Sequence, residues 1–202
     1  METVSTVIPG LMQKKQFNVV DVLQHAATWN GNVEVITNSV EGGIHRIGYA
    51  ELYDRTSQLA NALNRLGVNA GDRIGTMAWN TWRHLECWYG LSGIGAICHT
   101  LNPRLFPDQL EYIVNHAQTR FIFVDTSFVP VITNVLDKLP LLEGLIVMTD
   151  EEHMTDDMRE LGIPVYCYEE LLATEGSDFV WPLFSADTAS SLCYTSGTTG
   201  NP

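Results

Sequence analysis

The chain has 202 residues, of which 45% are apolar and 17% charged, so it is long enough to bury a core and too apolar to be disordered. Its 24 acidic and 11 basic residues give a formal net charge of −13 with histidine neutral. This balance repels phosphate backbones and anionic lipids, which argues against nucleic acid or a membrane surface as a partner. Six of the acids fall within residues 150–160, a run that is typical of a solvated face.

No basic segment followed by an apolar run opens the chain, and the most apolar later stretch, 89–98, is about half the length of a membrane span. We therefore expect a cytoplasmic protein without a transmembrane segment. The four cysteines lack the paired spacing of a zinc site and the density of a disulfide framework. The simplest interpretation is reduced core thiols at Cys87, Cys98, Cys167 and Cys193.

The first part of the chain predicts a helix, a hairpin and a second helix. Residues 19–28 form the first helical segment, and the β-prone runs 33–37 and 44–49 are joined through two glycines, which favours a hairpin. Apolar residues then recur at helical spacing over 50–66. Gly67 follows where a left-handed cap is expected.

Beyond residue 73, apolar β-prone runs alternate with helical segments. We expect strands at 74–79, 96–100, 121–124, 145–148, 165–168 and 189–193, with helices around Leu85 and from Pro107 to Ala117. Strands that are apolar on both faces and separated by helices are typical of a parallel sheet, because parallel neighbours need a crossover. The sequence therefore predicts an α/β fold, a mainly parallel sheet with helices on both faces, and no linker divides it.

The most specific segment is 194–202, Tyr-Thr-Ser-Gly-Thr-Thr-Gly-Asn-Pro, which follows the expected strand 189–193. Its glycines allow backbone N–H groups to converge, and four hydroxyls in five positions add donors without adding charge, which suits a polyphosphate. The Walker pattern is excluded, because two residues rather than four separate Gly197 from Gly200. By composition alone, such a run is also typical of a flexible loop.

Residues 194–202 closely resemble the phosphate-binding loop of the adenylate-forming superfamily, which includes acyl-CoA synthetases, firefly luciferase and peptide-synthetase adenylation domains. Residues 91–96 and 99–105 resemble the segment that precedes this loop in fatty-acyl-CoA ligases. The runs 79–80 and 83–86 look most like ligases for medium-chain or methylthiopropionate-type acids. The resemblance implies that 1–202 is a partial N-terminal AMP-binding domain, an incomplete part of the large domain, which ends inside the phosphate loop and lacks the C-terminal domain.

The resemblance also implies a reaction. Such enzymes join a carboxylic acid to AMP with loss of pyrophosphate and then replace AMP with the thiol of CoA, so ATP, Mg²⁺ and CoA are the implied cofactors. Mg²⁺ would screen the repulsion between the carboxylate and the triphosphate. The implied phosphate-binding residues, with Thr195 also a contact for Mg²⁺, are Thr195, Ser196, Gly197, Thr198, Thr199 and Gly200. The catalytic residues are expected beyond Pro202, so we expect the chain alone to be inactive; a homodimer is expected from relatives.

Two other functions are compatible with the sequence. One is a truncated, non-catalytic binding or dimerisation module. The other is a different adenylating enzyme, such as an aryl-acid ligase or a peptide-synthetase adenylation domain.

Weaker motifs have simpler structural explanations. The run 93–98 begins like a dinucleotide fingerprint but precedes a strand instead of following one, so close helix packing explains it better. The pairs His84 with Cys87 and Cys98 with His99 could ligate a metal, although two ligands without a second pair are more typical of packing. We expect core or interface packing for Trp79, Trp82, Trp88 and Tyr89.

Overall fold

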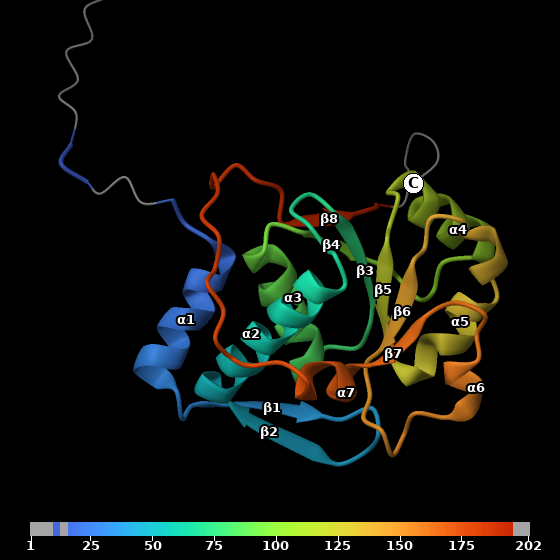
Figure 1. Cartoon of the computed structure of the whole chain (residues 1–202), viewed down its shortest axis with the longest axis horizontal. Helices are drawn as coiled ribbons and strands as arrows, with labels where there is room; N and C mark the ends of the chain where they lie inside the picture. Colours follow the sequence, from blue (N-terminus) through green and yellow to red (C-terminus); the bar gives the residue numbers. More distant parts are fainter. Residues whose placement is uncertain (1–9, 13–15, 196–202) are drawn as a thin grey trace, which may run out of the picture.

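A computed structural model describes residues 10–12 and 16–195. Their main feature is a six-stranded sheet in the order β7-β6-β5-β3-β4-β8, in which every neighbouring pair is parallel (Figure 1). A separate two-stranded hairpin, β1-β2, is antiparallel. The predicted α/β class with a mainly parallel sheet is confirmed.

The elements follow the predicted alternation. The strands are β1 (Glu34–Asn38), β2 (Ile44–Gly48), β3 (Arg73–Met77), β4 (Ile97–Thr100), β5 (Phe121–Val124), β6 (Gly144–Val147), β7 (Val165–Cys167) and β8 (Ser191–Cys193). The α-helices are α1 (Val19–Asn30), α2 (Tyr49–Arg65), α3 (Trp82–Gly93), α4 (Pro107–His116), α5 (Val129–Thr133), α6 (Asp156–Arg159) and α7 (Tyr168–Ala173). Two 3₁₀ turns are η1 (Thr126–Phe128) and η2 (Leu136–Lys138).

The first helices and the hairpin form where local sequence signals place them. Asn18 caps α1 by accepting a hydrogen bond from the N–H of Val20. The chain leaves α2 through Gly67, whose φ of +76° is the left-handed conformation that glycine adopts at no steric cost. The register of the hairpin pairs Val35 with Ile47, so these two apolar side chains stand side by side.

Helices cover both faces of the sheet, as predicted, because successive residues of each strand point to opposite sides. Phe123 of β5 lies in a core with α2, α3 and α7, whereas its neighbour Ile122 lies in a second core with α4 and α5. A third, smaller cluster joins α1, β2, α2 and α3 through residues such as Leu23 and Trp82. The sheet is thus the middle of three layers.

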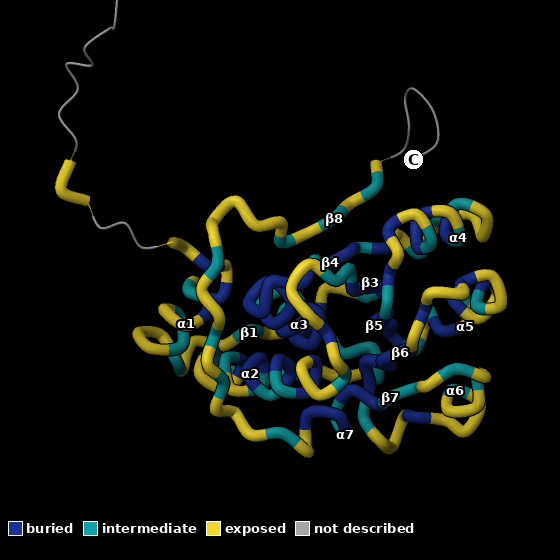
Figure 2. Tube along the Cα trace, turned by 45° about the horizontal axis from the view of Figure 1, so that its top comes forward, coloured by how far each residue is buried: buried dark blue, intermediate teal, exposed yellow. Residues whose placement is uncertain are grey.

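A long segment, 174–190, leads from α7 to β8 and crosses the side of the molecule that carries α1 and α2 (Figure 1). Most of it is exposed (Figure 2). Trp181 anchors it, because its indole N–H donates a 3.0 Å hydrogen bond to the hydroxyl of Tyr53 and its ring packs against the first core. We call this segment the strap.

Three sequence expectations are wrong in detail. Tyr168, expected at the end of a strand, is the first residue of α7, where its ring packs edge-on against Phe123. Cys193, expected as a core thiol, is exposed because β8 ends the sheet and has one neighbour among the described strands. Trp79, expected in core or interface packing, lies outside the core and is 53% exposed, because it lies in the turn between β3 and α3.

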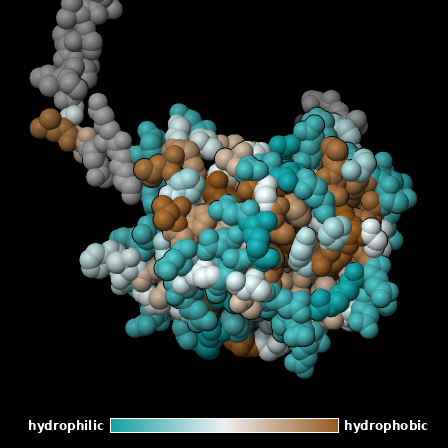
Figure 3. Space-filling model, in the orientation of Figure 1, coloured by the Kyte–Doolittle hydropathy of each residue, from teal (hydrophilic) through white to brown (hydrophobic). Residues whose placement is uncertain are grey.

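The acidic run 150–160 is mostly exposed, in agreement with its interpretation as a solvated face. Figure 3 shows predominantly hydrophilic residues over the region of α6, where part of this run lies.

Candidate functional site

The predicted phosphate loop starts at the carboxyl edge of the sheet. Because the strands are parallel, their carboxyl ends meet there, and α/β proteins place their sites at that edge. β8 ends at Cys193, so Tyr194 and Thr195 emerge at this edge, and Thr195 is exposed. The other predicted loop residues, Ser196, Gly197, Thr198, Thr199 and Gly200, lie outside the described residues.

Tyr194 is held by residues that sequence reasoning did not connect to it. Its hydroxyl lies 2.6 Å from Nδ1 of His116, the last residue of α4. The ring of His116 is stacked on Tyr112, and Tyr194 also packs 5.3 Å, centroid to centroid, from the ring of His99. The first residues of the loop are therefore fixed to both α4 and β4.

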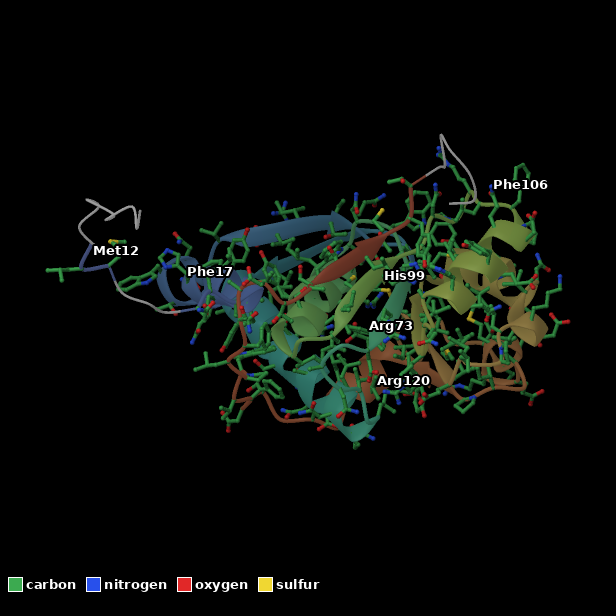
Figure 4. All side chains as sticks on the ribbon, turned by 90° about the horizontal axis from the view of Figure 1, so that it is seen from above. Met12, Phe17, Arg73, His99, Phe106 and Arg120 are labelled. Carbon is green, nitrogen blue, oxygen red and sulfur yellow. The ribbon has the colours of Figure 1, made fainter. Side chains whose placement is uncertain are left out.

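His99 is the buried part of this arrangement. Its side chain is fully buried, and Nδ1 lies 2.9 Å from the hydroxyl of Thr119. Burial lowers the pKa of His99 to about 4, so the imidazole is neutral near pH 7. Among residues 10–12 and 16–195, its Nε2 finds no hydrogen-bond partner. In Figure 4, His99 lies beneath β8, and Arg73 and Arg120 lie toward the amino ends of the strands.

A buried ion network occupies the other half of the same edge. Arg83 pairs with Glu41 at 2.6 Å and with Glu169 at 2.7 Å, and it also donates to the carbonyl of Met148. A hydrogen bond from the hydroxyl of Ser39 and the charge of Arg83 outweigh burial and lower the pKa of Glu41 to about 2. Arg83 thereby ties the β1-β2 turn to α7 and to the end of β6.

This network borders an open pocket of about 470 Å³, lined by Trp82, His45 and both arginines, Arg55 and Arg83, among others. The ring of His45 stacks on that of Trp82 at 3.7 Å. Because Arg55 and Arg83 are already paired with carboxylates, the pocket offers no unpaired guanidinium to an anion. We assign it a structural role.

One member of each candidate metal pair, His84 and Cys98, makes other contacts. The two ring nitrogens of His84 lie 3.2 Å from the carbonyl of Trp79 and 3.1 Å from the hydroxyl of Thr76. Cys98 contacts the same threonine through sulfur. Within residues 10–12 and 16–195, no three His, Cys, Asp or Glu side chains are placed to hold a metal ion together.

The glycines of the apparent dinucleotide fingerprint serve packing. A Cβ on Gly93 would lie 2.5 Å from the ring of Trp181, so this position admits the strap only without a side chain. Gly95 has φ of +79°, as expected for the turn into β4. The same Cβ would lie 3.2 Å from Val20 of α1, so the expected close helix packing is present at Gly93, although the tightest contact there is with the strap.

Comparison with known proteins identifies the family. The family model described as AMP-binding enzyme matches residues 23–202, which is most of the chain. The chain belongs to the AMP-binding enzyme family.

Relatives within the AMP-binding family include CoA ligases. The chain is 41% identical over 194 residues to a 3-methylmercaptopropionyl-CoA ligase of Ruegeria lacuscaerulensis and 37% identical over 193 residues to a medium-chain-fatty-acid–CoA ligase of Ectopseudomonas oleovorans. Each comparison covers 96% of this chain and 35% of the relative. The chain therefore spans about a third of the length of these relatives.

Solved structures of other enzymes share the fold. An anthranilate CoA ligase, AuaEII, in complex with anthranoyl-AMP superposes with a TM-score of 0.81 at 23% identity, covering 94% of this chain and 34% of that one. A fatty acyl CoA synthetase of Mycobacterium tuberculosis gives a TM-score of 0.73 at 20% identity, covering 89% of this chain and 32% of that one. In the described part of this AMP-binding family member, none of the helices has the length and apolarity that crossing a bilayer requires.

Proposed function

We propose that the chain is the phosphate-loop part of an AMP-forming acyl-CoA ligase, which joins a carboxylic acid to AMP with release of pyrophosphate and then transfers the acyl group to CoA. The observation that carries this proposal is the position of Tyr194 and Thr195. The segment that resembles a phosphate loop begins where β8 leaves the carboxyl edge. The 41% identity to a methylmercaptopropionyl-CoA ligase favours an acyl substrate over an aryl one.

The loop residues would act through donors and not through charge. Hydroxyls of Thr198 and Thr199 and the backbone N–H groups around Gly197 and Gly200 would stabilise the negative charge on the leaving phosphates. Mg²⁺, when bound, supplies the positive charge that the segment itself lacks. Thr195 fits as an oxygen contact for that ion, because its side chain is exposed at the edge and Mg²⁺ retains water in its remaining positions.

The residues around Tyr194 would contribute by fixing the start of the loop. Donors that are already in place when charge develops need no reorganisation during the reaction. The contacts of Tyr194 with His116 and His99 would hold the first residue of the loop in a fixed position. A neutral His99 avoids placing a further charge beneath the loop.

Methylmercaptopropionate and medium-chain fatty acids are the acids that we propose to test first. We also propose that the enzyme is a homodimer and acts in the cytoplasm, where ATP and CoA are available. The 202-residue chain on its own should not catalyse either half-reaction, because in this proposal the remaining groups of the active site lie outside residues 1–202.

A chimera tests the function directly. Residues 1–202 replace the aligned segment of the Ruegeria lacuscaerulensis ligase, and pyrophosphate release is measured with methylmercaptopropionate, ATP and Mg²⁺. We expect activity within about tenfold of the parent, which is about 1.4 kcal/mol in the barrier. The same chimera with Gly200→Val is the inactive control. A chimera that folds and binds CoA but releases no pyrophosphate would contradict the proposal.

A further inference from the structure

Helix α1 carries more apolar surface than the described part of the chain covers. Its inner side packs on α2 and α3 through residues such as Val20 and Leu23. A second apolar row follows its outer side at positions i, i+3, i+7 and i+10, and consists of Val19, Val22, Ala26 and Trp29. The three larger side chains of this row are 38%, 47% and 74% exposed, in chain order. One apolar row is enough to pack a helix on a core, so the outer row is available to a partner.

The strap extends the outer row into a patch. Asn18, directly before α1, donates a 3.5 Å hydrogen bond from Nδ2 to the carbonyl of Pro182, so the strap runs beside the start of the helix. On either side of this contact Val180 and Leu183 are 92% and 84% exposed, and Phe17 is 62% exposed. Figure 3 shows apolar residues over the strap beside α1. We call the outer row together with Phe17, Val180 and Leu183 the α1 patch.

The α1 patch has the composition and the size of an interface. None of its side chains is charged, although the chain has a net charge of −13, and two are aromatic. Interface cores are depleted of charged residues and enriched in aromatic ones. The exposed fractions correspond to on the order of 600 Å² of apolar surface, at the upper end for one patch on a monomer. With a polar rim, this approaches the roughly 800 Å² that each partner buries in a stable dimer.

The outer row of α1 is self-complementary under a twofold rotation. When two copies of α1 cross in antiparallel orientation, Val19 of one copy lies opposite Trp29 of the other, and Val22 lies opposite Ala26. Each pair joins a larger side chain to a smaller one, and Ala26 allows the helix axes to approach. A twofold dimer requires such a row, because every residue pair occurs twice in it. Another segment of the same polypeptide would not require this symmetry.

We propose that the α1 patch binds a second copy of this chain through an antiparallel, twofold contact between the two α1 helices, flanked by the straps. The inference rests on the proposed function only for the homodimer, whose surface it names. Association is measured without substrates. Failure of the proposed reaction is therefore seen separately from failure of this interface.

Sedimentation equilibrium of the 202-residue chain measures its association, and we expect a dimer with a dissociation constant of roughly 1–100 µM. Trp29→Glu should weaken the dimer by about tenfold or more, because it removes an aromatic anchor and places a charge in the contact. Phe106→Glu is the matched control. Phe106 is 71% exposed but lies at the start of α4, at the opposite end of the molecule from Phe17 (Figure 4).

Two double variants test the antiparallel arrangement. Val19→Glu with Trp29→Lys places opposite charges across the contact, whereas Val19→Glu with Trp29→Glu places like charges there. The two positions are about 15 Å apart along α1, so these charges act between copies and not within one helix. The first variant should dimerise at least about tenfold more tightly than the second. If either loses the methyl dispersion of a folded protein, Ala26→Arg replaces the pair, because arginine favours a helix and should block the close approach.

Four results would overturn the proposal. The first two are a native chain that stays monomeric up to about 100 µM and equal association of the native and Trp29→Glu chains. The third is equal association of the two double variants, or of Ala26→Arg and native chains. The last comparison uses the chimeric ligase. If Trp29→Glu leaves the association of that complete protein unchanged, the rest of the same polypeptide covers the α1 patch, and a second copy does not.

Discussion

Arg55 and Glu86 form an ion pair with 2.6 Å between Nε and Oε1, although the side chain of Glu86 is fully buried. The hydroxyl of Tyr168 donates a further hydrogen bond, also of 2.6 Å, to the same carboxylate. Burial raises the pKa of Glu86, and the guanidinium and hydroxyl oppose that effect by stabilising the carboxylate. The ion pair links α2 to α3, and the hydrogen bond from Tyr168 links both helices to α7.

Removing one partner of this pair should destabilise the protein strongly. Arg55→Met leaves the Glu86 carboxylate buried without its cation, which typically costs about 3–5 kcal/mol in the free energy of unfolding. Arg46→Met is the control, because Arg46 and Glu34 form a pair at 2.8 Å on the exposed hairpin, where loss costs about 0–1 kcal/mol. Urea unfolding of both variants measures the difference, and equal shifts would show that burial of Glu86 is not decisive.

His99 should make stability depend on pH. Its pKa is about 4 in the folded state and 6.5 in a model compound, so between these values the unfolded chain binds a proton that the folded chain does not. The free energy of unfolding should therefore fall as the pH drops from 6.5 to 4, by about 3 kcal/mol from this residue alone. His99→Leu should flatten that part of the curve. An unchanged slope in this variant would assign the effect to other groups, such as His84, whose pKa burial also lowers.

The strap should be sensitive to the size of residue 93. Gly93→Ala places a methyl group 2.5 Å from the ring of Trp181, so the strap must move, at a cost of about 1–3 kcal/mol. Gly176→Ala is the matched control, because nothing lies within 4 Å of its added carbon and its φ is not left-handed. Limited proteolysis within 174–190 should be faster in the first variant only. Equal rates in the two variants would show that Gly93 does not hold the strap.

The hydrogen bond between Tyr194 and His116 should protect the start of the proposed phosphate loop. Tyr194→Phe keeps the ring but removes the hydroxyl, which should cost about 0.5–1.5 kcal/mol and speed hydrogen exchange at Thr195. Tyr112→Phe is the control, since its hydroxyl has no hydrogen bond to the described residues while its ring still stacks on His116. Exchange that is unchanged in the Tyr194 variant would mean that packing alone fixes the segment.

Within the chimeric ligase, Thr198→Val should impair one half-reaction. The substitution keeps the shape of the side chain and removes the hydroxyl that the proposed function assigns to phosphate; loss of one such donor typically lowers the rate by about 10²–10³. Pyrophosphate release should fall by this factor. Thioester formation from preformed acyl-AMP and CoA should change far less, because pyrophosphate has already left. Equal losses in the two assays would contradict a phosphate role for Thr198.

The sequence by itself determined the elements and the fold class. Periodicity and local signals, such as the helical spacing before Gly67 and the apolar run 121–124, are properties of neighbouring residues, and the structure confirms both. The resemblance of 194–202 to a phosphate loop also rests on contiguous residues, and the family match agrees with it. Such features need no knowledge of which distant segments meet.

Only the tertiary structure decided which of these elements lie side by side. It therefore also decided which residues surround Tyr194 and Trp79. His116 and Tyr194 are 78 residues apart, and their hydrogen bond exists because β8 joins the sheet beside β4, next to the end of α4. Trp79 looks like a core residue in its apolar context, but it lies in the turn that follows β3, where it is exposed and borders an open cavity. The strand order decides which segments lie beside that turn, and local sequence does not encode that order.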